Sequence, residues 1–287
     1  MKINRFIFIF FIFISFSCDK ISPPFTVDEE LLDPYCGNSE NIIKKILIEE
    51  FTGHRCSACP NAARIIENEK NIYCDHIIVL AYHPNGFGVF TNPGSDPFSY
   101  EFRTPEGTEI AEQFEVPSLP RVLLNRTQNE TGGFIFGSGD LSTGSYVNDL
   151  LFDQNNNPIA PDLDINIDFE ETLISSLDIT VKLENLNELN GNYKLVVVIS
   201  EDEIISGQED GMEEIPDYEH NHIFRTSLNG TWGESIDLNQ ESIINKTFSF
   251  PYLNSNIIDL YKCSIIAYVY NEDTNEIIQA EQKYIEQ

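Results

Sequence analysis

The stretch Lys44–Ile66, KKILIEEFTGHRCSACPNAARII, contains the features that decide the fold of the surrounding chain. Its apolar run Ile46–Ile48 predicts a buried strand, which Thr52-Gly53 ends. Two cysteines follow three positions apart, and Pro60 suits the first turn of a helix because the amide that proline lacks has no partner there. The stretch therefore predicts a strand, a short cysteine loop and a helix in direct succession.

The pair Cys56 and Cys59 is typical of thiol–disulfide exchange. A CxxC pair between a strand and a helix can close into a small disulfide, and the helix N-terminus stabilises the thiolate of the first cysteine. Half of a zinc site has the same spacing. Zinc needs two further ligands, however, and no second CxxC or close Cys/His pair lies nearby in the sequence. We therefore expect a redox pair without metal or cofactor.

The N-terminal residues have the pattern of an export signal. The apolar run Phe6–Phe16 follows two basic residues and is too short for a membrane span of ~20 residues. It ends at Ser15-Phe16-Ser17-Cys18, which resembles the lipobox of bacterial lipoproteins, where the cysteine is lipidated and becomes the mature N-terminus. We expect a lipoprotein signal peptide over residues 1–17, lipidation of Cys18 and a tether over residues 18–40. An ordinary signal peptide is the alternative.

The net charge of −30 is concentrated toward the C-terminal end. Residues 159–287 carry 26 of the 47 acidic residues and only 6 of the 17 basic ones. A surface of this sign repels phosphate, so nucleic acid is a poor partner. The partners that we expect for an exported chain are thiols and disulfides of extracytoplasmic proteins, or a surface ligand.

Three cysteines remain after Cys18 and the CxxC pair. Six cysteines in an exported chain indicate oxidising surroundings. Cys36 precedes the first predicted strand and Cys74 the second, and neighbouring parallel strands begin at the same edge of a sheet. These two thiols can therefore come within the ~4.4–6.8 Å Cα separation of a disulfide. Cys263 shares a strand face with apolar residues, which predicts a buried free thiol.

Residues 41–158 continue with alternating strand and helix signals. The run His76–Tyr82 is typical of a strand covered on both faces, and two such strands joined by a helix predict a parallel pair. Thr104 and Pro105 predict the cap and first turn of a helix. The later elements predicted are an apolar strand after Pro120, a short strand at Phe134–Phe136 and a helix at Ser145–Phe152. This order resembles that of thioredoxin-like proteins.

The thioredoxin-like resemblance implies roles for four residues. Cys56 would be the exposed attacking thiol and Cys59 the buried resolving thiol. Glu50 matches a buried carboxylate that assists proton transfer to the resolving cysteine, although a strand-end carboxylate turned to water is the alternative. Pro120 matches a proline with a cis peptide bond whose loop faces the cysteine pair. Arg55 departs from the usual Trp before the first cysteine, and its charge would favour a thiolate at Cys56.

Residues 159–287 predict a second, all-β domain. Apolar and polar residues alternate in short runs, each of which gives a strand with one dry face. The predicted strands are Leu163–Phe169, Leu177–Leu183, Tyr193–Ile199, His222–Ser227, Ile243–Phe250, Cys263–Tyr270 and Glu276–Tyr284. Seven such strands with little helix predict a β-sandwich of immunoglobulin-like architecture.

The acid-rich segment Glu201–Asn221 is predicted to be a solvated loop. Carboxylates also bind calcium, but the spacing of an EF-hand is absent. His220 and His222 could begin a metal site, but two such histidines at a strand start more often form hydrogen bonds. We therefore expect no metal here.

The GHRCSACPNA motif, the strand from Pro120 and the stretch Tyr218–Trp232 together resemble the 28-kDa outer-membrane protein family of Bacteroidetes lipoproteins. This resemblance implies a thioredoxin-like domain and a β-sandwich on a lipid-anchored outer-membrane protein. The motif favours a thiol–disulfide oxidoreductase. One alternative is a surface binding or adhesin protein in which Cys56–Cys59 is only a structural link, and another is an inert structural lipoprotein.

Overall fold

The computed structural model describes residues 42–143, 145–173, 175–239 and 242–286. Cys18 and Cys36 lie outside these residues, so the lipidation of the first and the pairing of the second stay predictions. The described part is rich in β-structure, as expected, with fourteen strands and four α-helices. None of its helices is long and apolar enough to cross a membrane.

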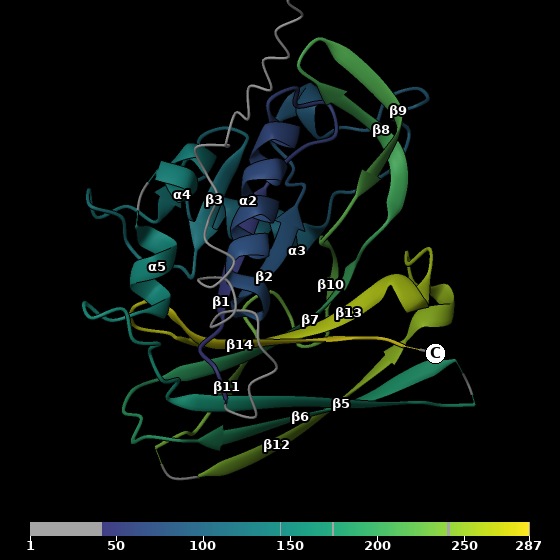
Figure 1. Cartoon of the computed structure of the whole chain (residues 1–287). Helices are drawn as coiled ribbons and strands as arrows, with labels where there is room; N and C mark the ends of the chain where they lie inside the picture. The colour runs from purple at the N-terminus through teal and green to yellow at the C-terminus, as the bar shows by residue number, and fades with distance from the viewer. Residues whose placement is uncertain (1–41, 144, 174, 240–241, 287) are drawn as a thin grey trace, which may run out of the picture.

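A sheet of nine strands runs through the centre of the molecule (Figure 1). Its main path is β14-β13-β7-β10-β2-β1-β3-β4, with β11 paired to β7. The bounds are β1 Ile46–Phe51, β2 Ile77–Tyr82, β3 Arg121–Leu124, β4 Ile135–Phe136, β7 Tyr193–Glu201, β10 Ile223–Ser227, β11 Glu234–Ile236, β13 Cys263–Asn271 and β14 Ile277–Tyr284. The predicted parallel pairing of β1 with β2 is confirmed, and β3 pairs antiparallel to β1.

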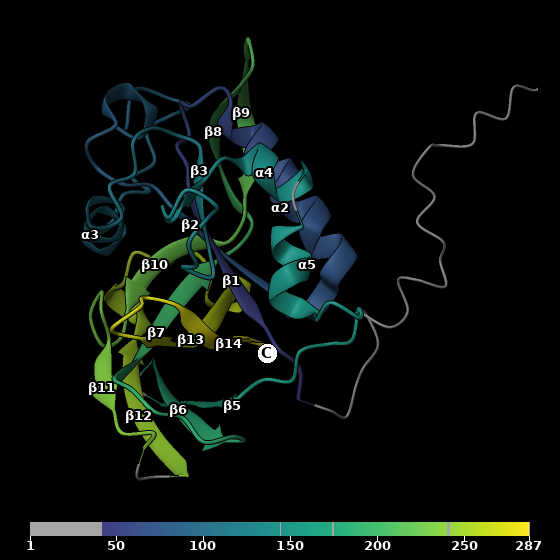
Figure 2. The same ribbon diagram turned by 90° about the vertical axis from the view of Figure 1, so that its left-hand side faces the viewer.

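Helices cover both faces of the N-terminal part of this sheet (Figure 2). One face packs against α2, α4 and α5 through apolar residues that include Ile48, Ile66 and Val147, and the other packs against α3 through Ile110. The bounds are α2 Cys59–Tyr73, α3 Pro105–Gln113, α4 Ser138–Thr143 and α5 Tyr146–Leu151. Since all six residues of β1 are buried, its acidic positions are removed from water as well.

A second sheet covers the C-terminal part of the central one. It has the order β12-β6-β5, with bounds β5 Leu163–Glu171, β6 Ser176–Asn185 and β12 Ile243–Pro251. The apolar positions of β5 and β6 form one core with those of β7 and β13, including Ile165, Val181 and Val197. The alternation seen in the sequence therefore gives each of these strands its buried face. Cys263 lies in this core as a buried free thiol, as predicted.

The central sheet crosses the boundary predicted near residue 159. Strand β10 joins β2 in parallel through one residue pair, Ile223 and Ala81, and the Ala81 amide donates to the His222 carbonyl at 2.7 Å. Beside this junction Arg126 and Glu49 form an ion pair with no exposed side-chain surface, and Arg126 also donates to the Tyr268 hydroxyl at 3.1 Å. The two segments therefore share a sheet and a core, while the boundary itself stays a prediction.

The predicted acidic loop is wrong, because Glu201–Asn221 contains a β-hairpin. Strands β8 (Ile204–Asp210) and β9 (Glu213–His220) form a separate two-stranded sheet. Figure 1 shows this hairpin, residues 204–220, rising beside helix α2. The alternation of apolar and polar residues did not reveal this hairpin, because β9 is exposed along most of its length and contains few apolar residues.

Candidate functional site

Cys56 and Cys59 are joined by a disulfide between β1 and the start of α2. The Cys56 amide donates to the Gly53 carbonyl and the Cys59 amide to the Cys56 carbonyl, both at 3.0 Å, and these bonds fold the loop into a tight turn. Cys59 is the first residue of the helix, with Pro60 behind it. The sequence therefore predicted the local structure of this motif correctly.

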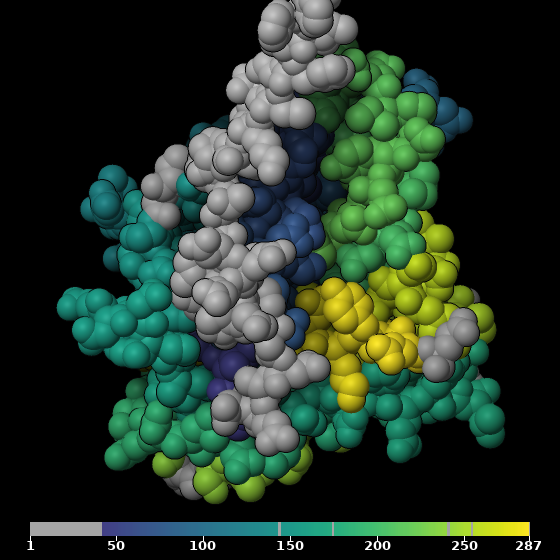
Figure 3. Space-filling view, viewed as in Figure 1, coloured from purple at the N-terminus to yellow at the C-terminus, as the bar shows by residue number. Residues whose placement is uncertain are grey.

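The expectation that Cys56 is exposed is wrong. Only 4% of Cys56 and 1% of Cys59 is accessible. Cys56 is buried because the hairpin of residues 204–220 packs against the motif. No local sequence pattern predicted this contact. In the space-filling view its green surface lies directly against the dark blue surface of α2 (Figure 3).

The hairpin is held to the cysteine loop by backbone hydrogen bonds. The Glu209 amide donates to the His54 carbonyl at 2.9 Å, and the Gly211 amide donates to the Ser57 carbonyl at 2.8 Å. Between them, the Gln208 side-chain amide lies 3.3 Å from the carbonyl oxygens of both Gly53 and Cys56. The strand β8 therefore runs along the segment that contains Cys56.

Two ion pairs add to this contact. Arg64 of α2 pairs with Asp210 at 2.9 Å, and Arg55 approaches Glu209 at 3.6 Å. The Arg55 guanidinium also lies 5.5 Å from the centre of the Phe98 ring. The positive charge of Arg55, which was expected to act on Cys56, is therefore also close to the Glu209 carboxylate of the hairpin.

Glu50 is buried, so the alternative of a carboxylate turned to water is wrong. Only 4% of the residue is accessible, and its Oε1 has no hydrogen-bond partner. Burial raises the pKa of Glu50 to about 7, against the opposing effects of the His222 charge and a hydrogen bond with Thr52. A carboxyl group with this pKa can take up and release a proton near neutral pH.

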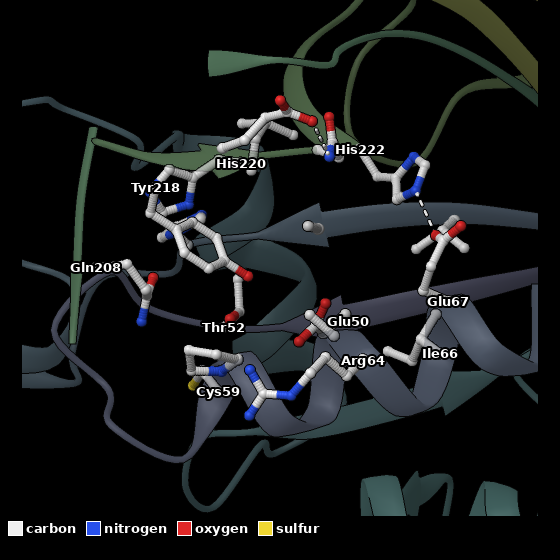
Figure 4. Close-up of a pocket in the computed structure, with 18 residues that line it drawn as sticks. Glu50, Thr52, Cys59, Arg64, Ile66, Glu67, Gln208, Tyr218, His220 and His222 are labelled. Carbon is white, nitrogen blue, oxygen red and sulfur yellow. Dashed lines mark hydrogen bonds and ion pairs between the residues drawn. The ribbon is translucent and has the colours of Figure 1, made fainter. Parts of the chain in front are cut away.

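A cavity of about 220 Å³ connects Glu50 with Cys59 (Figure 4). Its floor comes from β1, β2 and α2, and its opposite wall comes from β9 and the start of β10. The labelled side chains around it are Glu50, Thr52, Cys59, Arg64, Ile66, Glu67, Gln208, Tyr218, His220 and His222. The wall from Tyr218 to His222 could not be assigned from sequence, since it lies about 160 residues from Cys59 and shares no spacing with it.

His222 lies between two carboxylates at this cavity. It pairs with Asp202 at 3.3 Å and with Glu67 at 3.6 Å. Burial opposes the charge, but the two carboxylates outweigh burial and raise the pKa of His222. His222 therefore joins the start of β10 to α2 through Glu67.

Three further histidines pack around Phe102 next to the motif. The ring centres of His54, His83 and His220 lie 5.5, 4.6 and 4.6 Å from that of Phe102. Burial lowers the pKa of both His54 and His220 to about 4, and burial with the neighbouring histidines holds the pKa of His83 well below its usual range. All three are neutral at pH 7, and His220 joins the hairpin to this cluster. No grouping of three or more metal-ligating side chains occurs in the described ranges.

Pro120 lies at the same end of the sheet as the cysteine loop. The Leu119–Pro120 peptide bond is cis, and the next residue, Arg121, pairs with Phe51 at the end of β1. Pro120 is not among the described residues that line the cavity. The structure thus brings Glu50 and Cys59 to one cavity, and Pro120 to the same edge of the sheet.

The fold and the site define a β-rich protein with a buried CxxC disulfide beside an acidic, histidine-lined cavity. A family model described as outer membrane protein Omp28 matches residues 108–287, well over half of the chain. The protein belongs to this family and is an outer-membrane protein, which confirms the resemblance noted in its sequence. The matched residues begin after the cysteine motif.

Solved structures resemble the fold of most of this chain. HBP35 of Porphyromonas gingivalis has a TM-score of 0.63 at 14% identity, covering 86% of this chain and 77% of that one. Protein AGR_C_4864 from Agrobacterium tumefaciens has a TM-score of 0.50 at 14% identity, covering 86% of this chain and 99% of that one. At this identity the likeness concerns the fold alone. No curated protein matches the chain.

Proposed function

We propose that this outer-membrane protein catalyses thiol–disulfide exchange with extracytoplasmic proteins through a thioredoxin-like domain over residues 41–158. The observation that carries the proposal is the Cys56–Cys59 disulfide at the start of α2, which shares a cavity with a buried carboxyl group of pKa about 7. The order of strands and helices around Pro120 supports the same assignment. Residues 159–287 form the immunoglobulin-like sandwich in this proposal.

The reaction conserves thiols and electrons. With the pair reduced, the Cys56 thiolate attacks a substrate disulfide, forms a mixed disulfide and releases one substrate thiolate, which takes up a proton. The Cys59 thiolate then attacks the Cys56 sulfur, releases the second substrate thiol and closes the Cys56–Cys59 disulfide. Two electrons pass from the protein to the substrate, and the reverse sequence oxidises a substrate dithiol.

Glu50 and Pro120 have supporting roles in this mechanism. Glu50 accepts the proton of Cys59 when that thiol becomes the attacking group, because a carboxylate that titrates near pH 7 is matched to the task. The loop at Pro120 presents backbone groups to an extended substrate. Neither role needs a cofactor.

A trapping experiment tests the proposal. Reduced Cys59→Ser protein, mixed with a disulfide-bonded test protein such as insulin, should accumulate a mixed disulfide through Cys56, while Cys56→Ser should form none. Cys263→Ser is the matched control, because this thiol is buried in the other core and should leave exchange unchanged. Absence of a trapped species in Cys59→Ser would contradict the proposal.

A second function, that of a surface binding protein with a structural disulfide, is favoured by one observation. The hairpin is bonded to the cysteine loop, and only 4% of Cys56 and 1% of Cys59 is accessible. The reduction potential of the pair separates the two functions. A structural disulfide should have a potential below about −300 mV, whereas an exchange catalyst should have a higher one.

We also propose that the protein is anchored through a lipid on Cys18 after removal of residues 1–17. The motif Ser15-Phe16-Ser17-Cys18 at the end of a short apolar run supports this. Cys18→Ala should release the protein from membranes. Unchanged membrane association of that variant would reject the anchor.

A further inference from the structure

The contact between the hairpin and the cysteine loop resembles the way in which an added strand binds. Strand β8 and the turn after it donate backbone amides to carbonyl oxygens on both sides of Cys56, from Glu209 to His54 and from Gly211 to Ser57. A third amide, that of Gly207, donates to the Pro97 carbonyl at 3.0 Å. Extended polypeptides are commonly recognised through main-chain hydrogen bonds of this kind. The chain's own strand therefore occupies a face on which another polypeptide strand can bind.

Gly207 allows this close approach. A Cβ at this position would lie 2.7 Å from the Pro97 carbonyl oxygen and 2.8 Å from the carbonyl carbon, both of which belong to the backbone. Since backbone atoms cannot rotate away as a side chain does, any larger residue here must push strand β8 away from Pro97. The fit is thus specific to the closed position.

The hairpin also has the features of a segment that can move as a unit. Its two strands form a sheet of their own, separate from the nine-stranded and three-stranded sheets. Most residues of β9 are exposed, and Met212 at the turn is fully exposed. An isolated two-stranded hairpin is marginally stable. Its closed position therefore depends on its contacts with the cysteine loop, α2, Pro97 and the cluster around Phe102.

We propose that hairpin β8–β9 is a gate over the Cys56–Cys59 disulfide, which an extended segment of the substrate polypeptide displaces before exchange. This inference rests on the proposed function. In the closed position the gate protects the disulfide from reaction with other thiols. A bound substrate strand replaces the backbone donors of β8 with its own and exposes Cys56 to its cysteine.

The gate predicts how fast the disulfide is reduced by dithiothreitol. In that reaction two reagent thiols become one cyclic disulfide, and the Cys56–Cys59 disulfide takes up two electrons and two protons to give two thiols. The rate is measured on the full chain by alkylating the released thiols and counting the added groups by mass. Since the thiols appear only when the gate is open, the rate reports on opening.

Two kinds of variant open the gate by different means. Glu209→Ala with Asp210→Ala removes both ion pairs, and exposed pairs of this kind are worth enough to speed reduction roughly threefold to tenfold together. Gly207→Ala opens the gate because the added Cβ collides with Pro97, and it leaves the charge near Cys56 unchanged. It therefore distinguishes an effect of opening from an electrostatic effect on the thiolate. We expect both to accelerate reduction.

Matched controls are available on the same chain. Glu213→Ala with Glu214→Ala removes two acids from the outer strand of the same hairpin, where both side chains are exposed. Gly139→Ala adds a Cβ that would have no atom within 4 Å apart from its chain neighbours and the backbone of its own helix. Both controls should be reduced at the rate of the parent protein. In the parent, the amides of Glu209 and Gly211 should exchange with deuterium much faster than those of β7.

Equal reduction rates in the opening variants and the controls would overturn the gate. So would acceleration by the charge variant without acceleration by Gly207→Ala, or protection of the Glu209 and Gly211 amides equal to that of β7. A different outcome would separate the two proposals. If the opening variants are reduced fast but form no mixed disulfide when they also carry Cys59→Ser, the gate is supported and the proposed exchange function is rejected.

Discussion

Replacement of Arg126 tests how the two halves of the chain are held together. The Arg126 guanidinium donates two hydrogen bonds of 2.7 Å to the Glu49 carboxylate and a third to the Tyr268 hydroxyl. Four aromatic rings surround it, with centres 5.3 to 6.0 Å away. Arg126 and Glu49 come from the N-terminal half, whereas Tyr268 comes from the C-terminal half.

The variant Arg126→Ala should be strongly destabilising. Its main effect is to leave the Glu49 carboxylate buried, with no exposed surface and no cation. Removing one partner of a buried ion pair costs about 3–5 kcal/mol in the free energy of unfolding. For a chain of this size that corresponds to a fall in melting temperature of about 6–20 °C.

Thermal unfolding followed by circular dichroism measures this effect. The double variant Glu49→Gln with Arg126→Met should unfold at a higher temperature than Arg126→Ala, because it leaves no buried charge unpaired. Lys182→Ala breaks an exposed pair with Glu184 and should not change the melting temperature measurably. If Arg126→Ala melted like Lys182→Ala, the buried ion pair would not contribute to holding the two halves of the chain together.

Four further predictions follow from the same structure. Glu50→Gln should slow the resolving step and remove a transition near pH 7 from the rate profile of exchange; an unchanged profile would exclude Glu50 as the proton acceptor. Stability should fall as the pH drops from about 6.5 toward about 4, because the unfolded chain binds protons that the buried histidines cannot, and His220→Leu should flatten this fall in urea titrations. Glu50 acts in the opposite direction between about 4.5 and 7, where its raised folded pKa lowers stability as the pH rises, so the histidine effect is best measured in a Glu50→Gln background. The fragment 159–287 should fold with β-type circular dichroism, since its own core is complete, but should be less stable than the whole chain; an unstructured fragment would refute the boundary. Peptide mapping should find Cys36 joined to Cys74, and any other partner for either cysteine would reject that pairing.

Local features of the fold could be predicted from the sequence. The continuous apolar runs identified β1 and β2, and alternation identified strands such as β5 and β6, because one side of each must be buried. The CxxC spacing and Pro60 predicted the disulfide loop and the helix that follows it. In each case the predictive pattern lies within one short segment of the sequence.

The environment of the site was decided by the tertiary structure. The cover over Cys56, the wall of the cavity at Tyr218 and the cluster around Phe102 all join segments separated by a hundred residues or more. A pattern of apolar residues in the sequence indicates that one face of a strand or helix is buried, but it does not indicate which segment covers that face. The acidic composition of the hairpin predicted exposure to solvent. Two of its backbone amides nevertheless bond to the cysteine loop, and it forms ion pairs with Arg55 of that loop and Arg64 of α2. The same burial raised the pKa of Glu50, because desolvation depends on all the atoms packed around a group rather than on its neighbours in the sequence.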